Sequence, residues 1–326
     1  MNTLVIGDIH GCYNELQALL DKAGLSNGDK IVAVGDIVDR GPETPEVLGF
    51  FQNTSRTYAL MGNHERKHVR ASRGEIQLSL SQRISQFQLA ESYPGAVTWM
   101  SSLPIFLDLP EAIIVHGYIE PGISLLEQNP SIVCGTMGGE RILRDHYDRP
   151  WYELYDGNRP LIVGHLNYTD SDQPFIYQDK VFGLDTSSVM GKTLTGLLLP
   201  SFQIVSVPSR GNLWERVLRE YRTAKRAGVI QAIESWSNQD NAALVELIEK
   251  VQAASEAILA KLRFTPGYSQ LKPRQQAKMY ADIVGNGPSA VLMQMARLGK
   301  LDLESARKVV RNAARIGDIA RQIDGF

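Results

Sequence analysis

Five separate apolar runs in this chain each end at a glycine next to a residue that can ligate a metal ion. The runs are short, rich in Val, Ile, Leu and Ala, and typical of β-strands. Their ends are Gly7-Asp8-Ile9-His10, Gly35-Asp36, Gly62-Asn63, His116-Gly117 and Gly164-His165. In open α/β sheets, ligand sites lie outside the carboxyl ends of parallel strands. We therefore expect these five ends to meet at one crevice, a requirement that few folds satisfy.

The first third of the chain alternates between strand and helix patterns. Apolar runs at 4–6, 31–34 and 58–61 are separated by helical patterns at 16–23 and 42–51. This alternation is typical of parallel strands joined by crossover helices.

The chain then continues with other patterns. Residues 66–103 favour helices, and further strands are predicted at 113–115 and 161–163. The short runs within 175–207, interrupted by Gly and Pro, predict an antiparallel sheet that closes this part of the chain.

The C-terminal third differs from the rest of the chain, because the spacing of its apolar residues predicts amphipathic helices throughout. The helices are predicted at 212–227, 238–261, 272–283, 288–298 and 302–316. The charge also changes, from a net −9 over residues 1–208 to +7 over residues 209–326. We therefore predict a catalytic domain at 1–208 and a helical C-terminal extension at 209–326.

Composition indicates the compartment. The two cysteines, Cys12 and Cys134, are too few for a disulfide framework and suit a reducing environment. The N-terminus has no basic segment ahead of its apolar run, and no apolar stretch is long enough to span a bilayer. We expect a cytoplasmic protein without a membrane partner.

The residue types at the strand ends suit a pair of divalent metal ions. Asp8 and His10 are two residues apart, so on an extended segment both side chains point the same way and can chelate one ion. Asp36 can bridge two ions through its carboxylate. Neutral ligands to the second ion are Asn63, His116 and His165. Mixed carboxylate and imidazole favours Mn²⁺, with Fe or Zn²⁺ as alternatives, and two such ions can activate a water for attack on phosphorus.

Three further residues complete a catalytic interpretation. His64 directly follows Asn63, so it projects differently and can protonate a leaving group, while Asp39 can orient its imidazole. Arg40 offers a planar fork for two phosphate oxygens. The remaining histidines, His68 and His146, fall outside the strand-end motifs and are predicted to lie at the surface.

The blocks around Asp8, Asp36 and Asn63 resemble the signature of the calcineurin-like metallophosphoesterases, and 36–41 resembles the phosphoprotein phosphatase branch. The resemblance covers residues 1–208 and implies an α/β fold, an α+β sandwich with two sheets flanked by helices. It implies that Asp8, His10 and Asp36 ligate one metal ion, and that the other is ligated by Asp36, Asn63, His116 and His165. It also implies the roles given above for His64, Asp39 and Arg40.

The chain departs from the family pattern at some positions. Tyr118 follows His116-Gly117 where the family often has His-Ala-Gly, and Ser187 replaces the glycine of a common Asp-Thr-Gly. The resemblance also implies a second phosphate-binding arginine before the last histidine. Arg141 is preferred for this role over Arg144.

Several activities are consistent with these residues. We expect a phosphatase acting on phosphate monoesters of the phosphoserine or phosphothreonine type, so that its partner is a phosphorylated protein or a small phosphoester. The alternatives are a symmetric dinucleoside tetraphosphate hydrolase and a nucleic-acid-end phosphatase recruited by the basic helical tail. For the tail itself, docking on the acidic catalytic part, or simple solvation, is preferred over nucleic-acid binding.

Overall fold

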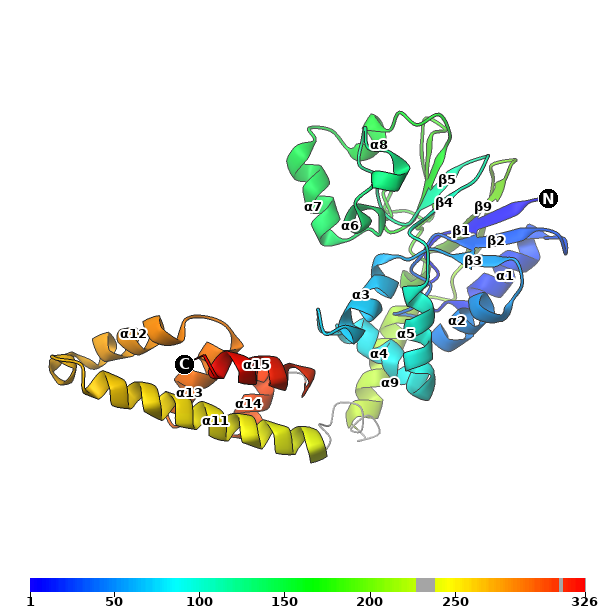
Figure 1. Cartoon of the computed structure of the whole chain (residues 1–326). Helices are drawn as coiled ribbons and strands as arrows, with labels where there is room; N and C mark the ends of the chain where they lie inside the picture. The colour runs from blue at the N-terminus through cyan, green and yellow to red at the C-terminus, as the bar shows by residue number, and fades with distance from the viewer. Residues whose placement is uncertain (227–237, 311–312, 326) are drawn as a thin grey trace. The chain divides into compact units, whose positions relative to one another are not determined.

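The computed structural model describes residues 1–226, 238–310 and 313–325, and the chain divides into two compact units, Met1–Ile230 and Gln231–Phe326. The first unit contains two β-sheets flanked by helices, and the second is helical (Figure 1). The predicted fold class, a two-sheet core with a helical C-terminal region, is confirmed.

The first sheet contains the N-terminal strands in the order β10-β9-β1-β2-β3. Its strands are β1 (Thr3–Ile6), β2 (Lys30–Ala33), β3 (Thr57–Ala59), β9 (Thr193–Leu199) and β10 (Gln203–Pro208). β1, β2 and β3 are parallel, as predicted, whereas β9 pairs antiparallel with both β1 and β10. All carboxyl ends of the parallel strands therefore lie at one edge of the sheet.

The second sheet has the order β4-β5-β6-β8-β7. Its strands are β4 (Phe106–Asp108), β5 (Ile113–Val115), β6 (Leu161–Val163), β7 (Phe175–Tyr177) and β8 (Val181–Gly183). β5, β6 and β8 are parallel, and the edge strands β4 and β7 are antiparallel to their neighbours. The antiparallel strands predicted within 175–207 are present as the pairs β7-β8 and β9-β10. The prediction that they form one sheet was wrong, because β7 and β8 extend the second sheet while β9 and β10 extend the first.

Continuous apolar strands are explained by burial on both faces. In β1, Leu4 and Ile6 belong to the core beneath the helices, while Val5 belongs to the core between the two sheets. Successive side chains of a strand point to opposite faces, so a strand covered on both sides has no polar position. The core between the sheets also contains Ile114 of β5 and Ile162 of β6.

Helices cover the outer faces. The first sheet packs on helices α1 (Tyr13–Ala23), α2 (Thr44–Asn53), α3 (Asn63–Ser72) and α5 (Tyr93–Ser101), with α4 (Leu80–Leu89) and the 3-10 helices η1 (Ala90–Ser92) and η3 (Ser188–Met190) nearby. The second sheet packs on η2 (Leu125–Glu127), α6 (Pro130–Val133), α7 (Met137–His146) and α8 (Trp151–Leu154). The predicted helical character of 66–103 is confirmed by α3, α4 and α5.

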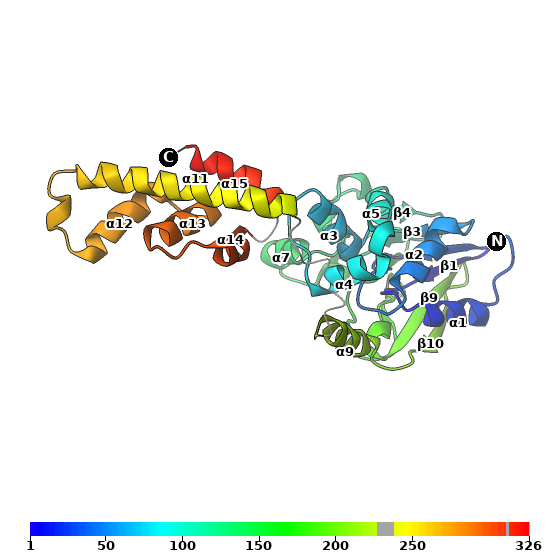
Figure 2. The same ribbon diagram turned by 90° about the horizontal axis from the view of Figure 1, so that it is seen from below.

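Helix α9 (Leu213–Arg226) belongs to the first unit although it follows residue 208. Its Val217 and Tyr221 are buried against Ile84 of α4, and the two helices lie side by side in both ribbon views (Figures 1 and 2). Just before it, Arg210 Nε donates to Glu15 Oε1 at 3.0 Å. The functional division into 1–208 and 209–326 stays a prediction.

The second unit is built around the long helix α11 (Asn238–Arg263), which contacts each of the other α-helices of the unit (Figure 2). These elements are η4 (Tyr268–Gln270), α12 (Pro273–Val284), α13 (Pro288–Arg297), α14 (Leu303–Val310), η5 (Ala313–Arg315) and α15 (Ile316–Ile323). Along α11, Leu244, Leu247, Val251 and Ile258 are buried in the core of this unit. The predicted helical positions 227 and 311–312 lie outside the described residues. Among the described helices, none is long and apolar enough to cross a membrane.

Candidate active site

Four predicted metal ligands converge between the two sheets. Asp36 follows β2, Asn63 begins α3 after β3, and His116 and His165 follow β5 and β6. Asn63 Oδ1 lies 3.1 Å from His116 Nε2 and 2.9 Å from His165 Nδ1, and His116 Nε2 lies 3.4 Å from Asp36 Oδ1. Ligand atoms of Asp36, His116 and His165 all lie within 4.8 Å of one another, which is the spacing that a shared cation needs.

The orientation of the Asn63 amide is informative. With its oxygen toward the cluster, the amide oxygen faces acceptor atoms, and exchanging oxygen and nitrogen would let the amide donate to His165, His116 and Asp36. The amide can thus present either atom to this group: its nitrogen would donate to these neighbours, or its oxygen would ligate a cation placed among them. The donor set of oxygen and imidazole nitrogen therefore fits a divalent transition-metal ion.

A second group lies on the other side of Asp36. His10 Nε2 is 3.7 Å and His64 Nε2 is 3.9 Å from Asp36 Oδ2. Asp36 thus lies between the two groups: Oδ2 is the oxygen nearer His10 and His64 and is also 3.1 Å from the Asn63 amide, while Oδ1 is 3.4 Å from His116 Nε2. A carboxylate in this position can bridge two ions. The predicted ligand Asp8 follows β1, and its Oδ1 accepts a hydrogen bond from the backbone N–H of His165 at 2.9 Å.

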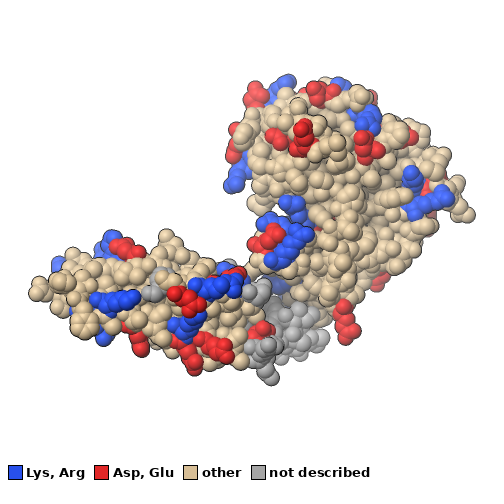
Figure 3. Space-filling model, viewed as in Figure 1, with Lys and Arg blue, Asp and Glu red and all other residues tan. Residues whose placement is uncertain are grey.

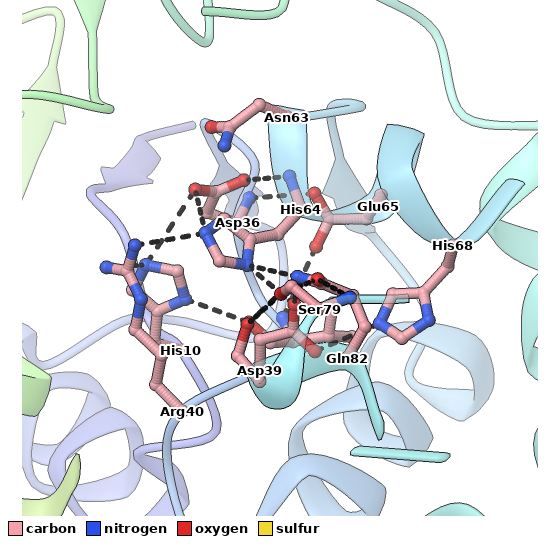
Figure 4. Close-up of polar contacts among 12 residues, drawn as sticks. His10, Asp36, Asp39, Arg40, Asn63, His64, Glu65, His68, Ser79 and Gln82 are labelled. Atoms are coloured by element: carbon pink, nitrogen blue, oxygen red, sulfur yellow. Dashed lines mark hydrogen bonds and ion pairs between the residues drawn. The ribbon is translucent and has the colours of Figure 1, made fainter. Parts of the chain in front are cut away.

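Arg40 extends into this second group. Its guanidinium nitrogens lie 3.0 Å from His10 Nε2 and 3.1 Å from His64 Nε2 (Figure 4). A guanidinium is always protonated and can only donate, so in this arrangement both Nε2 atoms direct their lone pairs at Arg40. A lone pair at His10 Nε2 is what a metal ion would use, and the Arg40 charge beside it suits phosphate oxygens.

Burial and charge set the protonation of the cluster. Burial would lower the pKa of His116, but Asp36, Asp8 and Glu65 outweigh it and raise this pKa to about 9. Burial would raise the pKa of Asp36, yet His116 and His64 hold it well below its usual value. Burial and then the neighbouring Asp185 raise the pKa of Asp8. The buried carboxylates and imidazoles therefore stabilise each other's charged forms. A bound cation could take the place of the imidazole protons in stabilising the carboxylates.

The backbone between 36 and 40 is held in an unusual conformation. Asp36, Asp39 and Arg40 have φ values of 49°, 73° and 67°, in the left-handed region that non-glycine residues seldom adopt. Glu65 stabilises this loop, because its Oε1 accepts from Ile37 N and its Oε2 from Asp36 N, both at 2.9 Å. Strain of this kind is typical of functional sites.

Two glycines are needed for the loops to approach each other. A Cβ at Gly62 would lie 2.2 Å from Asp36 Oδ1, so a side chain there would displace the carboxylate. Gly35 has a φ of 124° and packs against the Gly62 backbone. The glycines that flank the predicted ligands therefore serve close packing as well as turning.

The predicted His64–Asp39 pair is present. His64 Nδ1 lies 2.6 Å from Asp39 Oδ2, and both side chains are buried. Because Asp39 binds Nδ1, the other ring nitrogen, Nε2, is the one that faces Asp36 and Arg40. His64 is therefore oriented to exchange a proton on the side where the candidate metal ligands lie.

His68 was predicted at the surface, and this prediction was wrong. Its side chain is fully buried, with Nε2 2.9 Å from Asp39 Oδ1 and Nδ1 3.0 Å from the Tyr93 hydroxyl. Gln82 of α4 also donates from Nε2 to Asp39 Oδ2 and was not predicted at all. The sequence signal for His68 was its spacing of four from His64, which places both on one face of α3. His146 is exposed, as predicted.

The arginine predicted to bind a second phosphate oxygen belongs to α7. Arg141 and Arg144 are both exposed on α7, and Arg144 pairs with Asp145 at 3.5 Å. Arg141 has no hydrogen bond or ion pair with the clustered residues in the part of the chain that is described. Its assignment stays a prediction.

Comparison with known proteins supports the interpretation of the site. The family model described as calcineurin-like phosphoesterase matches residues 1–180, more than half of the chain. Curated relatives described as bis(5'-nucleosyl)-tetraphosphatase PrpE, asymmetrical, come from Halalkalibacterium halodurans (28% identity, 67% of this chain, 98% of the relative) and Bacillus cereus strain Q1 (30% identity, 63% and 93%).

Solved structures agree with the fold. A crystal structure whose description proposes a diadenosine tetraphosphatase superposes with a TM-score of 0.50 at 23% identity, covering 64% of this chain and 93% of the other. At this identity the likeness concerns the fold alone. The family match shows that the chain belongs to the calcineurin-like phosphoesterase family, and this membership makes it a metal-dependent phosphoester hydrolase.

Proposed function

We propose that the chain is a two-metal phosphoesterase in which Asp36 bridges the ions. The observation that carries this proposal is the position of the Asp36 carboxylate, with Oδ1 3.4 Å from His116 Nε2 and Oδ2 3.7 Å from His10 Nε2. Asp8 and His10 would complete one site. The other site would be completed by Asn63, His116 and His165.

When bound, two such ions would supply Lewis acidity and make water a better nucleophile toward phosphorus. Carboxylate with imidazole ligands favours Mn²⁺, with Fe or Zn²⁺ as alternatives. Within the protein, Arg40 would bind the oxygens of the transferred phosphoryl group. His64, held at Nδ1 by Asp39, would take up a proton at Nε2 from water, and the resulting imidazolium would donate that proton to the leaving-group oxygen.

For the substrate, we propose a dinucleoside polyphosphate cleaved asymmetrically. The support is that curated relatives described as asymmetrical bis(5'-nucleosyl)-tetraphosphatases align with this chain over more than nine tenths of their own length. Such a substrate and a phosphate monoester differ in leaving group, while the attack on phosphorus and its metal requirement are the same.

The second candidate is a phosphomonoesterase acting on phosphoserine or phosphothreonine. It is favoured by the His64–Asp39 pair, because an alcohol is a poor leaving group that needs an acid, whereas a nucleotide phosphate leaves more readily. Recruitment of nucleic acid by the second unit has less support. Lysine, arginine and acidic side chains are interspersed on the face of that unit seen in Figure 3, so no continuous basic surface is visible there.

The test is to incubate the Mn²⁺-loaded protein separately with diadenosine tetraphosphate and with a phosphothreonine peptide. We expect ATP and AMP from the nucleotide, at a higher kcat/KM than phosphate release from the peptide. Two ADP would indicate symmetric cleavage. Faster release from the peptide would favour the phosphomonoesterase, and hydrolysis of neither compound with Mn²⁺, Zn²⁺ or Fe²⁺ would contradict the proposed activity.

A further inference from the structure

The Asp39 carboxylate of the His64–Asp39 pair also contacts side chains to which the proposed chemistry assigns no role. His68 Nε2 lies 2.9 Å from Asp39 Oδ1, and Gln82 Nε2 donates to Asp39 Oδ2 (Figure 4). Behind His68, the hydroxyl of Tyr93 lies 3.0 Å from Nδ1. The side chains of Asp39 and His68 are fully buried, so water does not supply these contacts.

The chemistry of these groups fixes the direction of each hydrogen bond. An ionised carboxylate only accepts, so His64 must donate from Nδ1 and His68 from Nε2. A neutral His68 then has its lone pair at Nδ1, where the Tyr93 hydroxyl can donate. Tyr93 therefore donates to His68, and His68 donates to Asp39. His64 donates to the other oxygen of the same carboxylate.

This arrangement constrains His64. Asp39 Oδ2 receives His64 and Gln82, while Oδ1 is held by His68. Without the His68 donor, Oδ1 would be a buried, charged acceptor that has lost its side-chain partner. The carboxylate would then lower its free energy by rotating or by moving away from the His64 ring. Loss of the Asp39 contact would allow the proton of neutral His64 to occupy either ring nitrogen.

We propose that His68 is a positioning residue for the reaction. It holds Asp39 so that His64 donates from Nδ1, which leaves Nε2 as the nitrogen that takes up a proton from water and passes it to the leaving group. The proposal rests on the proposed function, because it assigns to His68 an effect on the proton donor of that function. Within the described residues, the side-chain hydrogen bonds of His68 go to Asp39 and Tyr93 and not to a candidate metal ligand.

A matched pair of substitutions separates this role from simple packing. His68→Leu removes the donor and keeps much of the volume, whereas His68→Gln places an amide N–H where Nε2 stood. Each variant is assayed, as the full-length metal-loaded protein, on an alkyl phosphate, whose leaving group needs a proton, and on 2,4-dinitrophenyl phosphate, which does not. His146→Leu replaces an exposed histidine and is the control for replacing a histidine by leucine.

We expect His68→Leu to lower kcat on the alkyl ester by roughly 10-fold more than on the dinitrophenyl ester. This loss is smaller than the full rate enhancement of about 10²–10⁴-fold that a general acid contributes, because His64 itself remains. His68→Gln should recover much of this difference. In a His64→Ala background, His68→Leu should add nothing further. An equal loss on both esters, or no loss, would overturn the proposal, and His68→Gln or Tyr93→Phe supplies the same comparison if the leucine variant does not fold.

A second readout does not depend on turnover. ¹⁵N-imidazole NMR of the metal-stripped full-length chain reports which nitrogen of His64 carries the proton. We expect Nδ1 in the wild type and a mixture of tautomers in His68→Leu. An unchanged single tautomer would contradict the positioning role even if hydrolysis were found on neither ester, the result that would separately contradict the proposed function.

Discussion

Glu65 holds the backbone of Asp36 through a 2.9 Å hydrogen bond from the Asp36 amide to Oε2, and thereby positions a carboxylate that lies between the two candidate metal groups. The same Oε2 accepts from Gly62 N at 2.9 Å, while Oε1 accepts from Ile37 N and Val38 N. One buried side chain therefore joins the loop after β2 to the loop after β3. The geometry of the site depends on a residue that contacts no substrate.

Glu65→Gln should destabilise the protein and reduce its metal content. The substitution replaces an acceptor oxygen by an amide that donates toward backbone N–H groups, leaving buried donors unsatisfied at about 1–3 kcal/mol each. Urea unfolding measures the stability, and elemental analysis measures the bound metal. Glu75→Gln is the control, since Glu75 is exposed and forms an ion pair with Arg70. If the two variants behaved alike, Glu65 would not hold the loop.

His64→Ala should slow hydrolysis in proportion to the difficulty of the leaving group. The loss on an alkyl phosphate should be on the order of 10² or more, because the protonated imidazole is removed. On 2,4-dinitrophenyl phosphate the rate should change little. The measurement is the dependence of log kcat on the pKa of the leaving group across a series of aryl and alkyl esters. A slope identical to the wild type would show that another group protonates the leaving oxygen.

His116→Ala should lower the bound divalent metal from two ions per chain toward one. His116 Nε2 lies beside both Asp36 and Asn63, so its removal leaves one candidate group incomplete while His10 and Asp36 remain. Metal is counted after dialysis against Mn²⁺ and gel filtration. His146→Ala should retain the full complement, because His146 is exposed on α7. Equal metal content in both variants would remove His116 from the ligand set.

Tyr280→Phe should destabilise the second unit. The Tyr280 hydroxyl is fully buried, 2.6 Å from Ser255 Oγ, and donates to Met293 O at 3.0 Å. Its loss leaves a buried carbonyl and a buried hydroxyl short of a partner, at a cost of about 1–3 kcal/mol. Calorimetry should show a lower transition for this unit, whereas Lys278→Gln, which removes an exposed ion pair with Asp282, should change it by less than about 0.5 kcal/mol.

The positions of the strand ends could be predicted because they follow from local pattern. Apolar runs such as 113–115 and 161–163 coincide with β5 and β6, and the glycine after each predicted run marks where the chain turns. Parallel pairing then brings Asp36 and Asn63 together at the end of the first sheet, and His116 and His165 at the end of the second. The convergence of these two pairs also needed the two sheets to pack on each other, and no local pattern specifies that packing.

Other features depended on contacts between distant segments. The runs within 175–207 look alike in sequence, yet β8 pairs with β6 and β9 pairs with β1, and nothing local distinguishes these partners. β4 was not predicted, because its three residues have no distinctive period. His68 was misplaced because it was judged by its absence from a strand-end motif, whereas its spacing from His64 put it on the buried face of α3.

The packing of α9 on α4 bears on how a catalytic fragment of this protein should be cut. A fragment ending at residue 208, where the charge of the sequence changes sign, would lack the cover over Ile84 and the Arg210 partner of Glu15. The exposed apolar surface would lie on the same helix that carries Gln82, next to Asp39. Ending the fragment after Arg226 keeps that helix covered, so truncations intended to isolate hydrolysis from the rest of the chain should begin there.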